Sequence, residues 1–409
     1  MRIVLATVGT TGDVTPFAAL AEGLVDRGHA VMAVSWELHR HPFEQAGATF
    51  VAAGPPTRAE DIAATAVRAA GAGSPLAQVA VLRDFHLRDA DAHYRALRDV
   101  LPGHDLVLLH GIHSLAEAAS RDAGLRYATA VFDPVLLPTA TAPPAGFPSL
   151  GIGNRLAWWI LDRMLRRQDG PLREALTRAG SSSADEVSMF RARSSQLHLV
   201  AVSPIIAPPP PDLDATTHFT GAWLRSGPPA PLPAELDAFL AAGDPPVVVT
   251  FGSMAAPDTA ALLGEVAAGI RAAGHRALIQ DAGHAADRSG DGGIKWIGAA
   301  DHRALFPRAL AVVHHGGAGT SHAAAVAGVP SVVVPHVGDQ PFWATRLAAL
   351  GVAARPLPVE DVSAARVSQR VAAVADVNVR ERAARLGVAV RAEHGIVSAI
   401  GLLEEVAAG

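Results

Sequence analysis

Residues 310–330 read LAVVHHGGAGTSHAAAVAGVP, an apolar run followed by a glycine-rich turn and an alanine-rich segment. The run 310–314 is short and apolar up to its last residue, His314, which is typical of a parallel strand covered by helices on both faces. Three glycines in the turn let the backbone bend sharply, and a helix is predicted from about Gly319. A strand, a glycine loop and a helix in this order open a βαβ unit.

The same alternation extends outward over most of the chain. Longer alanine-rich amphipathic stretches separate short apolar runs rich in Val, Ile and Leu. These runs predict strands at 2–8, 30–35, 49–52, 106–109, 127–131, 197–202, 246–252, 276–280, 294–297, 310–314 and 330–335. The pattern predicts an α/β protein built from doubly wound parallel sheets.

Proline-rich stretches indicate where one domain ends. A length of 409 residues suggests two or three domains. Pro208–Pro211 is a run of prolines that fits neither a helix nor a central strand, and a second proline-rich stretch covers 227–233. We expect two Rossmann-like domains facing each other across a cleft. The predicted boundaries are an N-terminal domain at 1–203, a linker at 204–234, a C-terminal domain at 235–390 and a C-terminal helix at 391–409 that packs back towards the N-terminal domain.

Composition excludes several classes of protein. Apolar residues make up 50% and charged residues 18%, which argues against disorder, and a net charge of −5 argues against a nucleic-acid partner. The absence of cysteine excludes disulfides, thiolate catalysis and iron–sulfur clusters. The N-terminus lacks the features of a signal peptide, and no run reaches the ~18 apolar residues of a membrane span. We expect a cytoplasmic monomer or homodimer.

The glycine loop after residue 314 has the features of an anion site. The free N–H groups of a helix start attract anions, and the hydroxyls of Thr320 and Ser321 with the ring of His315 add donors. The only lysine, Lys295, lies outside this loop, so the pattern is not a Walker motif. We predict a diphosphate site, with a tight turn carrying incidental histidines as the alternative.

A second glycine loop, Gly9–Pro16, follows the first predicted strand, and its helix is expected from Thr15. The spacing of Gly9 and Gly12 does not match the dinucleotide fingerprint. Asp13 is the only acid in this loop, and it either serves as a catalytic base or caps the helix.

Two further polar elements follow strands of the second half. Asp339 and Gln340 come after the strand at 330–335 and offer several donors and acceptors, which suits sugar hydroxyls, although such a pair also begins helices. The stretch 250–254 ends the first strand of this half.

Four elements carry a resemblance to known proteins: the loop Gly9–Pro16, the stretch 250–254, the loop after residue 314 and the pair Asp339–Gln340. Together they resemble the GT-B glycosyltransferases of the sterol-glucosyltransferase and antibiotic (glycopeptide, macrolide, polyketide) type. The resemblance implies an inverting, metal-independent enzyme that moves a sugar from a UDP- or dTDP-sugar to a hydroxyl of a hydrophobic small-molecule acceptor. It places the diphosphate on His315, Gly317, Ala318, Gly319 and Thr320, the donor sugar on Asp339 and Gln340, a donor-side turn at Ser253, and the nucleobase near Ala300 and His302.

The chain also departs from some branches of this family. Plant-type relatives carry a histidine in the loop after the first strand and an aspartate after the fourth strand, where this chain has Thr11 and Gly111. Asp13 matches the acid of the glycopeptide and sterol branches and is the predicted base. The acceptor-side candidates are Thr10, Thr11, His113 and Asp133. Ala299 occupies the position that stacks on uracil elsewhere, so the choice between UDP and dTDP stays open.

Other chemistries are weaker interpretations. Two Asp-x-Asp matches, 89–91 and 212–214, are expected to be solvated surface, and neither a metal nor another cofactor is predicted. The alternatives are a non-hydrolysing nucleotide-sugar epimerase of the same fold and a catalytically silent sugar-nucleotide-binding protein. The missing dinucleotide fingerprint argues against a nicotinamide-dependent oxidoreductase.

Overall fold

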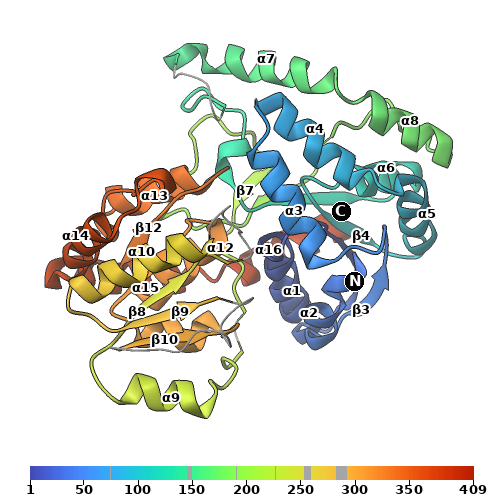
Figure 1. Cartoon of the computed structure of the whole chain (residues 1–409). Helices are drawn as coiled ribbons and strands as arrows, with labels where there is room; N and C mark the ends of the chain where they lie inside the picture. Colours follow the sequence, from blue (N-terminus) through green and yellow to red (C-terminus); the bar gives the residue numbers. More distant parts are fainter. Residues whose placement is uncertain (74, 145–149, 190, 226, 253–258, 282–292) are drawn as a thin grey trace. The chain divides into compact units, whose positions relative to one another are not determined.

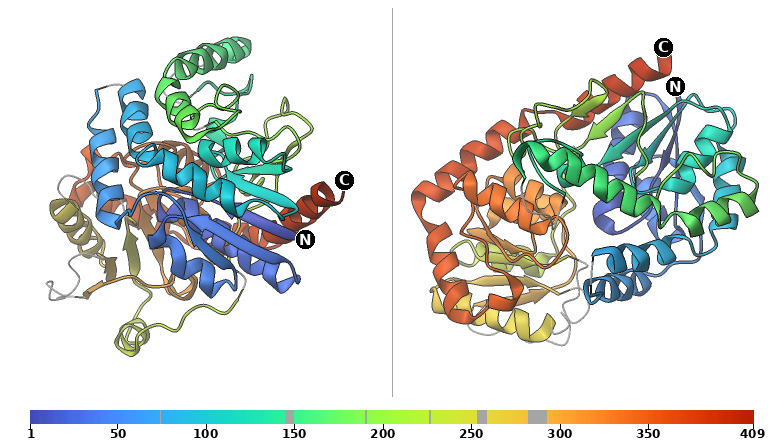
Figure 2. Two further views of the ribbon diagram at one scale, coloured as in Figure 1. Left: turned by 90° about the vertical axis from the view of Figure 1, so that its right-hand side faces the viewer. Right: turned by 90° about the horizontal axis from the view of Figure 1, so that it is seen from above.

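The computed structural model describes residues 1–409 except 74, 145–149, 190, 226, 253–258 and 282–292. The chain divides into two compact units, which are described separately. Unit 1 is Met1–Arg225 with His394–Gly409, and unit 2 is Ser226–Glu393. Each unit contains a parallel sheet with helices on both faces, so the predicted α/β class is confirmed (Figures 1 and 2).

The sheet of unit 1 has the strand order β3-β2-β1-β4-β5-β6-β7, and every neighbouring pair is parallel. The strands are β1 (Arg2–Ala6), β2 (Ala30–Ser35), β3 (Thr49–Ala52), β4 (Leu106–His110), β5 (Tyr127–Val131), β6 (His198–Val200) and β7 (Thr217–Phe219). The helices are α1 (Thr11–Asp26), α2 (Arg40–Gln45), α3 (Ala59–Ala70), α4 (Pro75–His86), α5 (Ala90–Val100), α6 (Ser114–Asp122), α7 (Asn154–Arg166), α8 (Gly170–Ala179) and α16 (Gly395–Ala408).

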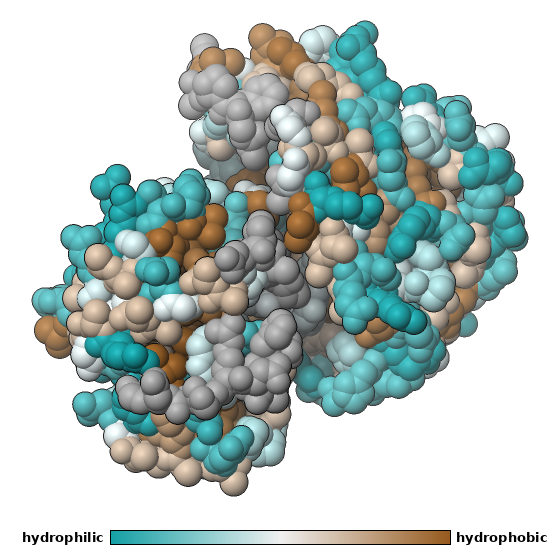
Figure 3. Space-filling model, in the orientation of Figure 1, coloured by the Kyte–Doolittle hydropathy of each residue, from teal (hydrophilic) through white to brown (hydrophobic). Residues whose placement is uncertain are grey.

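Strand residues of unit 1 are apolar on both sides because helices cover both faces. Successive side chains of a strand point to opposite faces. Ile3 and Leu5 therefore pack with α1, α2 and α16, whereas Val4 and Ala6 pack with α5, α6 and α8. Hydrophilic residues cover much of the outer surface of this unit in the view of Figure 3.

Unit 2 has a shorter parallel sheet with the order β10-β9-β8-β11-β12. The strands are β8 (Val247–Thr250), β9 (Ala277–Gln280), β10 (Ile294–Ile297), β11 (Ala311–His314) and β12 (Ser331–Val333). Helices α10 and α14 cover one face, and α9, α11 and α12 cover the other. The helices are α9 (Ala234–Ala241), α10 (Thr259–Ala272), α11 (His302–Leu305), α12 (Ala318–Ala327), α13 (Gln340–Ala349), α14 (Ala364–Ala375) and α15 (Val377–Arg391).

Two local features differ from the sequence-based expectation. The stretch predicted as a linker, 204–234, contains β7 and the buried Trp223, which belong to the sheet and core of unit 1. Helix α1 begins at Thr11 rather than at Thr15, and Pro16 lies inside it. The earlier start arises because Thr10 and Asp13 form a capping box that satisfies the first N–H groups of the helix.

One stretch, Val377–Ala408, is long and apolar enough to cross a membrane by length and composition alone. In the structure it consists of α15 and α16, which belong to different units and are separated at His394 by a left-handed backbone with φ of 50°. Helix α16 packs against α1, where a Cβ added at Gly23 would lie 2.5 Å from Ile396. Ile400 and Leu403 complete the core beneath it.

Candidate functional site

In open α/β sheets, ligands bind at the carboxyl ends of the strands, where the strand order reverses direction. In unit 1 this point lies between β1 and β4, because the chain passes from β1 to β2 and β3 on one side and to β4 and β5 on the other. Asp13 follows β1, and His110 ends β4. The fold therefore brings the predicted base to the expected ligand edge of this sheet.

The two oxygens of Asp13 have different surroundings. Oδ2 accepts hydrogen bonds from the Thr10 N–H (2.7 Å) and the Thr10 hydroxyl (2.8 Å). Oδ1 lies 3.9 Å from Nε2 of His110, which is too long for a direct hydrogen bond. The Asp13 side chain is 28% exposed, so a substrate can reach it. One oxygen caps the helix, and the other faces a buried imidazole.

His110 is an uncharged partner for Asp13 at neutral pH. Burial lowers its pKa, although the Asp13 charge works in the opposite direction. The His110 ring contacts the rings of Phe17 and Phe132, with centroid distances of 6.0 and 5.2 Å. The sequence analysis did not single out His110, because only the pairing of β1 with β4 brings it beside residue 13.

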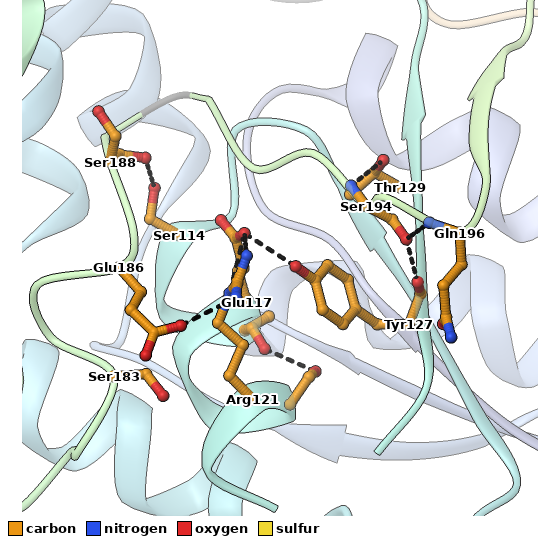
Figure 4. Close-up of polar contacts among 12 residues, drawn as sticks. Ser114, Glu117, Arg121, Tyr127, Thr129, Ser183, Glu186, Ser188, Ser194 and Gln196 are labelled. Atoms are coloured by element: carbon orange, nitrogen blue, oxygen red, sulfur yellow. Dashed lines mark hydrogen bonds and ion pairs between the residues drawn. The ribbon is translucent and has the colours of Figure 1, made fainter. Parts of the chain in front are cut away.

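A network of polar contacts links helix α6, which follows the turn after β4, to residues 186–188 (Figure 4). The Ser114 hydroxyl donates to the Ser188 carbonyl (2.8 Å), and Arg121 bridges Glu117 and Glu186 with distances of 3.1 Å. These contacts fix α6, whose N-cap residue is His113.

The other acceptor-side candidates are placed as follows. Thr10 is the N-cap of α1 and Thr11 is exposed at its first position. His113 is 2% exposed, and burial lowers its pKa well below the usual value. Asp133 caps a short 3-10 turn by accepting from the Val135 N–H (2.8 Å). Thr10, Thr11 and His113 thus share the loops after β1 and β4, whereas Asp133 follows β5.

In unit 2 the strand order reverses between β8 and β11, and the glycine loop after residue 314 lies there. Gly316 has φ of 91°, and a Cβ on it would lie 2.7 Å from Val333, so only glycine fits. Its N–H donates to Nδ1 of the buried His314 (3.1 Å), which closes the turn. The first helical bond of α12 runs from the Ser321 N–H to the Gly317 carbonyl (2.9 Å), so the N–H groups of 318–320 precede it.

His315 lies two residues before Gly317, the N-cap of α12. A Cβ on Gly317 would lie 2.5 Å from His315 Nε2, and a Cβ on Gly252 would lie 3.2 Å from its Cε1. The ring therefore occupies the space that both glycines leave open. Burial lowers the pKa of His315 to about 4, although a hydrogen bond to the Thr250 backbone works in the opposite direction, so the ring is neutral near pH 7.

The donor-sugar candidates also have structural partners. Gln340 is buried, and its side-chain oxygen accepts from the N–H groups of His336 (2.7 Å) and Val337 (3.1 Å). Asp339 accepts from the Trp343 indole (2.6 Å) and precedes α13. Gln340 thus closes the 336–340 turn with its oxygen, which leaves its amide N–H₂ as the group suited to a ligand.

Of the remaining donor-side candidates, His302 stacks on Phe306 at 4.3 Å and its Nε2 lies 3.1 Å from the Gln280 side-chain oxygen. Ala300 precedes it and packs on the core of this unit. Ser253 lies outside the described residues.

Among the described residues, no group of three or more His, Cys, Asp or Glu side chains could hold a metal ion. The Asp-x-Asp matches face arginines instead. Asp91 pairs with Arg178 (3.1 Å), and Asp212 pairs with Arg155 (3.0 Å).

Comparison with known proteins identifies the family. Residues 277–395 match the erythromycin biosynthesis protein CIII-like C-terminal domain, and residues 3–68 match the glycosyltransferase family 28 N-terminal domain. The chain is 34% identical to O-mycaminosyltylonolide 6-deoxyallosyltransferase of Streptomyces fradiae, over 99% of this chain and 97% of that protein. It belongs to this family of glycosyltransferases. The glycosyltransferase is also 32% identical to the vancomycin aglycone glucosyltransferase of Amycolatopsis orientalis, over 99% of this chain and 98% of that one.

Solved structures confirm the GT-B fold of this glycosyltransferase. The kitacinnamycin glycotransferase superimposes with a TM-score of 0.74 at 20% identity, over 99% of this chain and 98% of that chain. The glycosyltransferase VinC in complex with dTDP gives a TM-score of 0.68 at 20% identity, over 100% of this chain and 99% of that chain.

Proposed function

We propose that this glycosyltransferase transfers a sugar from a UDP- or dTDP-sugar to a hydroxyl of a small-molecule aglycone, with inversion at the anomeric carbon. The observation that supports this most directly is the loop of 314–320, where a neutral imidazole lies beside a helix start whose N–H groups of 318–320 precede the first helical hydrogen bond. Such an arrangement suits a diphosphate. The relatives named as macrolide and glycopeptide glycosyltransferases support the aglycone class.

Donor activation in this proposal depends on unit 2. The nucleoside diphosphate gains negative charge as the bond to the sugar breaks. The N–H groups of 318–320 and the ring N–H of His315 stabilise that charge, in the role that a divalent cation plays in other enzymes. The Gln340 amide and Asp339 bind hydroxyls of the sugar, and Ala300 and His302 contact the nucleobase.

Acceptor activation depends on unit 1. Asp13 Oδ1 takes the proton of the acceptor hydroxyl as its oxygen attacks the anomeric carbon. The bonds from Thr10 to Oδ2 fix the orientation of the carboxylate. His110 is close enough that one oxygen atom placed between it and Oδ1 could hydrogen-bond to both.

The test is mass spectrometry of the full chain incubated with UDP- and dTDP-sugars and a panel of hydroxylated aglycones. We expect aglycone mass to increase by one sugar and nucleoside diphosphate to be released. Conversion of the donor without any acceptor would favour the epimerase, and donor binding without turnover would favour a silent binding protein.

Metal independence is a separate part of the proposal. Excess EDTA should leave the initial rate within about twofold, because protein donors replace the cation. A tenfold loss that manganese or magnesium restores would contradict it.

A further inference from the structure

Helix α7 of unit 1 exposes an apolar face that the proposed catalysis does not use. Leu156 and Trp159 are each 57% exposed, and Ile160 is 40% exposed. Residues three and four positions apart lie on one face of a helix, so these three side chains form a continuous surface. Among the residues that the structure describes, no other Phe, Trp or Tyr side chain is exposed to the degree of Trp159. Apolar side chains gathered in this way, unlike scattered ones, indicate a contact surface.

The opposite side of α7 holds the helix on unit 1. Trp158 is buried, and its indole N–H donates to the Ala142 carbonyl (2.9 Å). Asn154 is fully buried at the start of the helix, where it accepts from the Leu150 N–H (2.8 Å) and donates to the Ala140 carbonyl (3.0 Å). Helix α7 is thus apolar on two sides, and packing on unit 1 accounts for one of them.

The C-terminal half of the exposed face is basic. Arg163 lies four residues after Trp159, with its guanidinium 5.8 Å from the centroid of the indole ring. Arg166 and Arg167 follow three and four positions further on, and all three arginines are exposed. The only acid within α7 is Asp162, which pairs with Arg166 (3.0 Å). Hydrophobic and hydrophilic residues accordingly lie next to each other along α7, at the top of Figure 3. We call the exposed surface formed by Leu156, Trp159, Ile160, Arg163, Arg166 and Arg167 the α7 face.

The chemistry of the α7 face fits the surface of an anionic lipid bilayer. Aliphatic side chains enter the boundary between headgroups and acyl chains, and a Trp ring suits this boundary because it is apolar with one polar N–H. Guanidinium groups bind phosphates through two hydrogen bonds, so arginines beside the apolar side chains gain a second kind of contact. The concentration of arginine also contrasts with the net charge of −5 of the whole chain.

The area of the α7 face argues against a protein partner. Three half-exposed side chains offer at most roughly 300 Å² of apolar contact, since even a whole aromatic side chain offers about 150–250 Å². Each partner in a stable protein interface buries about 800 Å². A bilayer needs no such minimum area, because its binding strength grows with each apolar side chain and each basic group that reaches it.

We propose that the α7 face binds an anionic lipid surface, with its apolar side chains at the headgroup boundary and its arginines on the lipid phosphates. The contact is peripheral, because the helix lies in the plane of the interface and does not cross it. It requires neither a donor nor an aglycone and is therefore independent of the proposed function. If that function holds, the contact brings the enzyme to the phase in which hydrophobic aglycones dissolve.

The test is co-sedimentation of the full, ligand-free chain with two kinds of vesicle. One is phosphatidylcholine alone, and the other is phosphatidylcholine with phosphatidylglycerol in equal parts. We expect at least tenfold tighter binding to the anionic vesicles, since each arginine near an anionic surface strengthens binding about fivefold. Raising NaCl from about 50 to about 500 mM should weaken this binding, because salt screens the charges. Equal binding to both vesicles, or binding to neither, would overturn the proposal.

Variants assign the binding to the α7 face. The double variant Trp159→Gln, Ile160→Gln removes apolar contacts and should weaken binding to anionic vesicles at least tenfold. The double variant Arg163→Gln, Arg167→Gln should weaken it roughly 25-fold and remove much of its salt dependence. Glutamine is a good helix former and these positions are exposed, so the melting temperature and the binding of UDP or dTDP should match the wild type. Undiminished binding in both variants would contradict the proposal.

The matched control lies in α15. Val388 is 63% exposed and has Arg385 and Arg391 three positions away on either side. Val388→Gln therefore removes an exposed apolar side chain beside arginines without changing the α7 face, and vesicle binding should stay within about twofold. A second measurement is the emission of Trp159, taken as the difference between the wild type and Trp159→Phe. It should shift to shorter wavelength on anionic vesicles, and an unshifted difference would place the lipid contact elsewhere.

Other occupants of the α7 face would give different results. A second copy of this chain would appear in analytical ultracentrifugation as a dimer that Trp159→Gln dissociates. An acidic protein would be indicated by binding to polyglutamate, weakened in the arginine variant, with no binding to vesicles. Either result would overturn the lipid assignment. Vesicle binding without transfer of a sugar to any aglycone would instead contradict only the proposed function.

Discussion

Replacing Asp13 by asparagine separates the two roles that the structure gives to this carboxylate. Asparagine keeps the length of the side chain, and its carbonyl oxygen can still accept from the Thr10 N–H in the capping box. It cannot take a proton from an acceptor hydroxyl. Loss of a general base lowers kcat by about 10²–10⁴, which corresponds to about 2.7–5.5 kcal/mol in the activation free energy.

The effect of the same change on stability is expected to be much smaller. It removes one negative charge at the N-terminus of α1 and weakens a cap, so the free energy of unfolding should fall by about 0.5–1.5 kcal/mol. The assay is the initial rate at saturating donor and aglycone, with donor affinity measured by calorimetry. We expect kcat to fall and donor affinity to stay within about twofold, because the proposed donor contacts lie in unit 2.

A matched control lies in α3. Asp61 occupies the corresponding position of another capping box and accepts from the Arg58 N–H at 2.9 Å. Asp61→Asn should therefore lower stability by a similar amount without changing kcat. The base assignment would be refuted by an Asp13→Asn enzyme that matches Asp61→Asn in turnover, and the base would then be sought at His110 or His113.

Three further predictions concern the donor loop and the buried histidines. His315→Ala and Thr320→Ala should each weaken UDP or dTDP binding by about 1.5–3 kcal/mol in calorimetry, and unchanged binding in both would argue against the diphosphate site. Gly317→Ala should displace the His315 ring, because the new Cβ would lie 2.5 Å from His315 Nε2. The backbone of residue 317, with φ of −61°, tolerates alanine. Donor affinity should therefore fall at least tenfold while the melting temperature changes little. Acid should destabilise the fold, because the pKa of His93 and of His314 falls from about 6.5 in the unfolded chain to about 3 on burial. The unfolded state alone takes up these protons as pH falls below 6.5, so each ring should remove about 1.4 kcal/mol of stability by pH 5.5 in urea titrations, and His93→Leu should flatten the dependence.

Much of the fold could be predicted from hydrophobic runs alone. Strands that helices cover on both faces are mostly apolar, so the predicted strand 106–109 coincides with all of β4 except His110. β7 could not be found in this way because Thr217–Phe219 is short, half-buried and preceded by prolines. Helix α1 begins before the predicted Thr15 because Thr10 and Asp13 form a capping box, although a proline such as Pro16 is typical of a first helical turn.

The candidate site was only partly visible in the sequence. The glycine loops could be recognised because their residues are contiguous, and Asp13 was the single acid in one of them. His110 could not be recognised, since only the parallel pairing of β1 with β4 brings it beside Asp13. The one signal available was the occurrence of histidines at strand ends, as with His110 and His314.

The return of α16 to unit 1 has a consequence for synthesis and for engineering. The core around α1 includes Ile400 and Leu403, which the ribosome adds only after all of unit 2 has been made. Unit 1 therefore stays incomplete until then, and a fragment ending near Arg225 would expose the apolar side of α1. A chimera that exchanges unit 2 for that of a relative needs two junctions, one near Arg225 and one near His394, so that the terminal helix stays with the unit it stabilises.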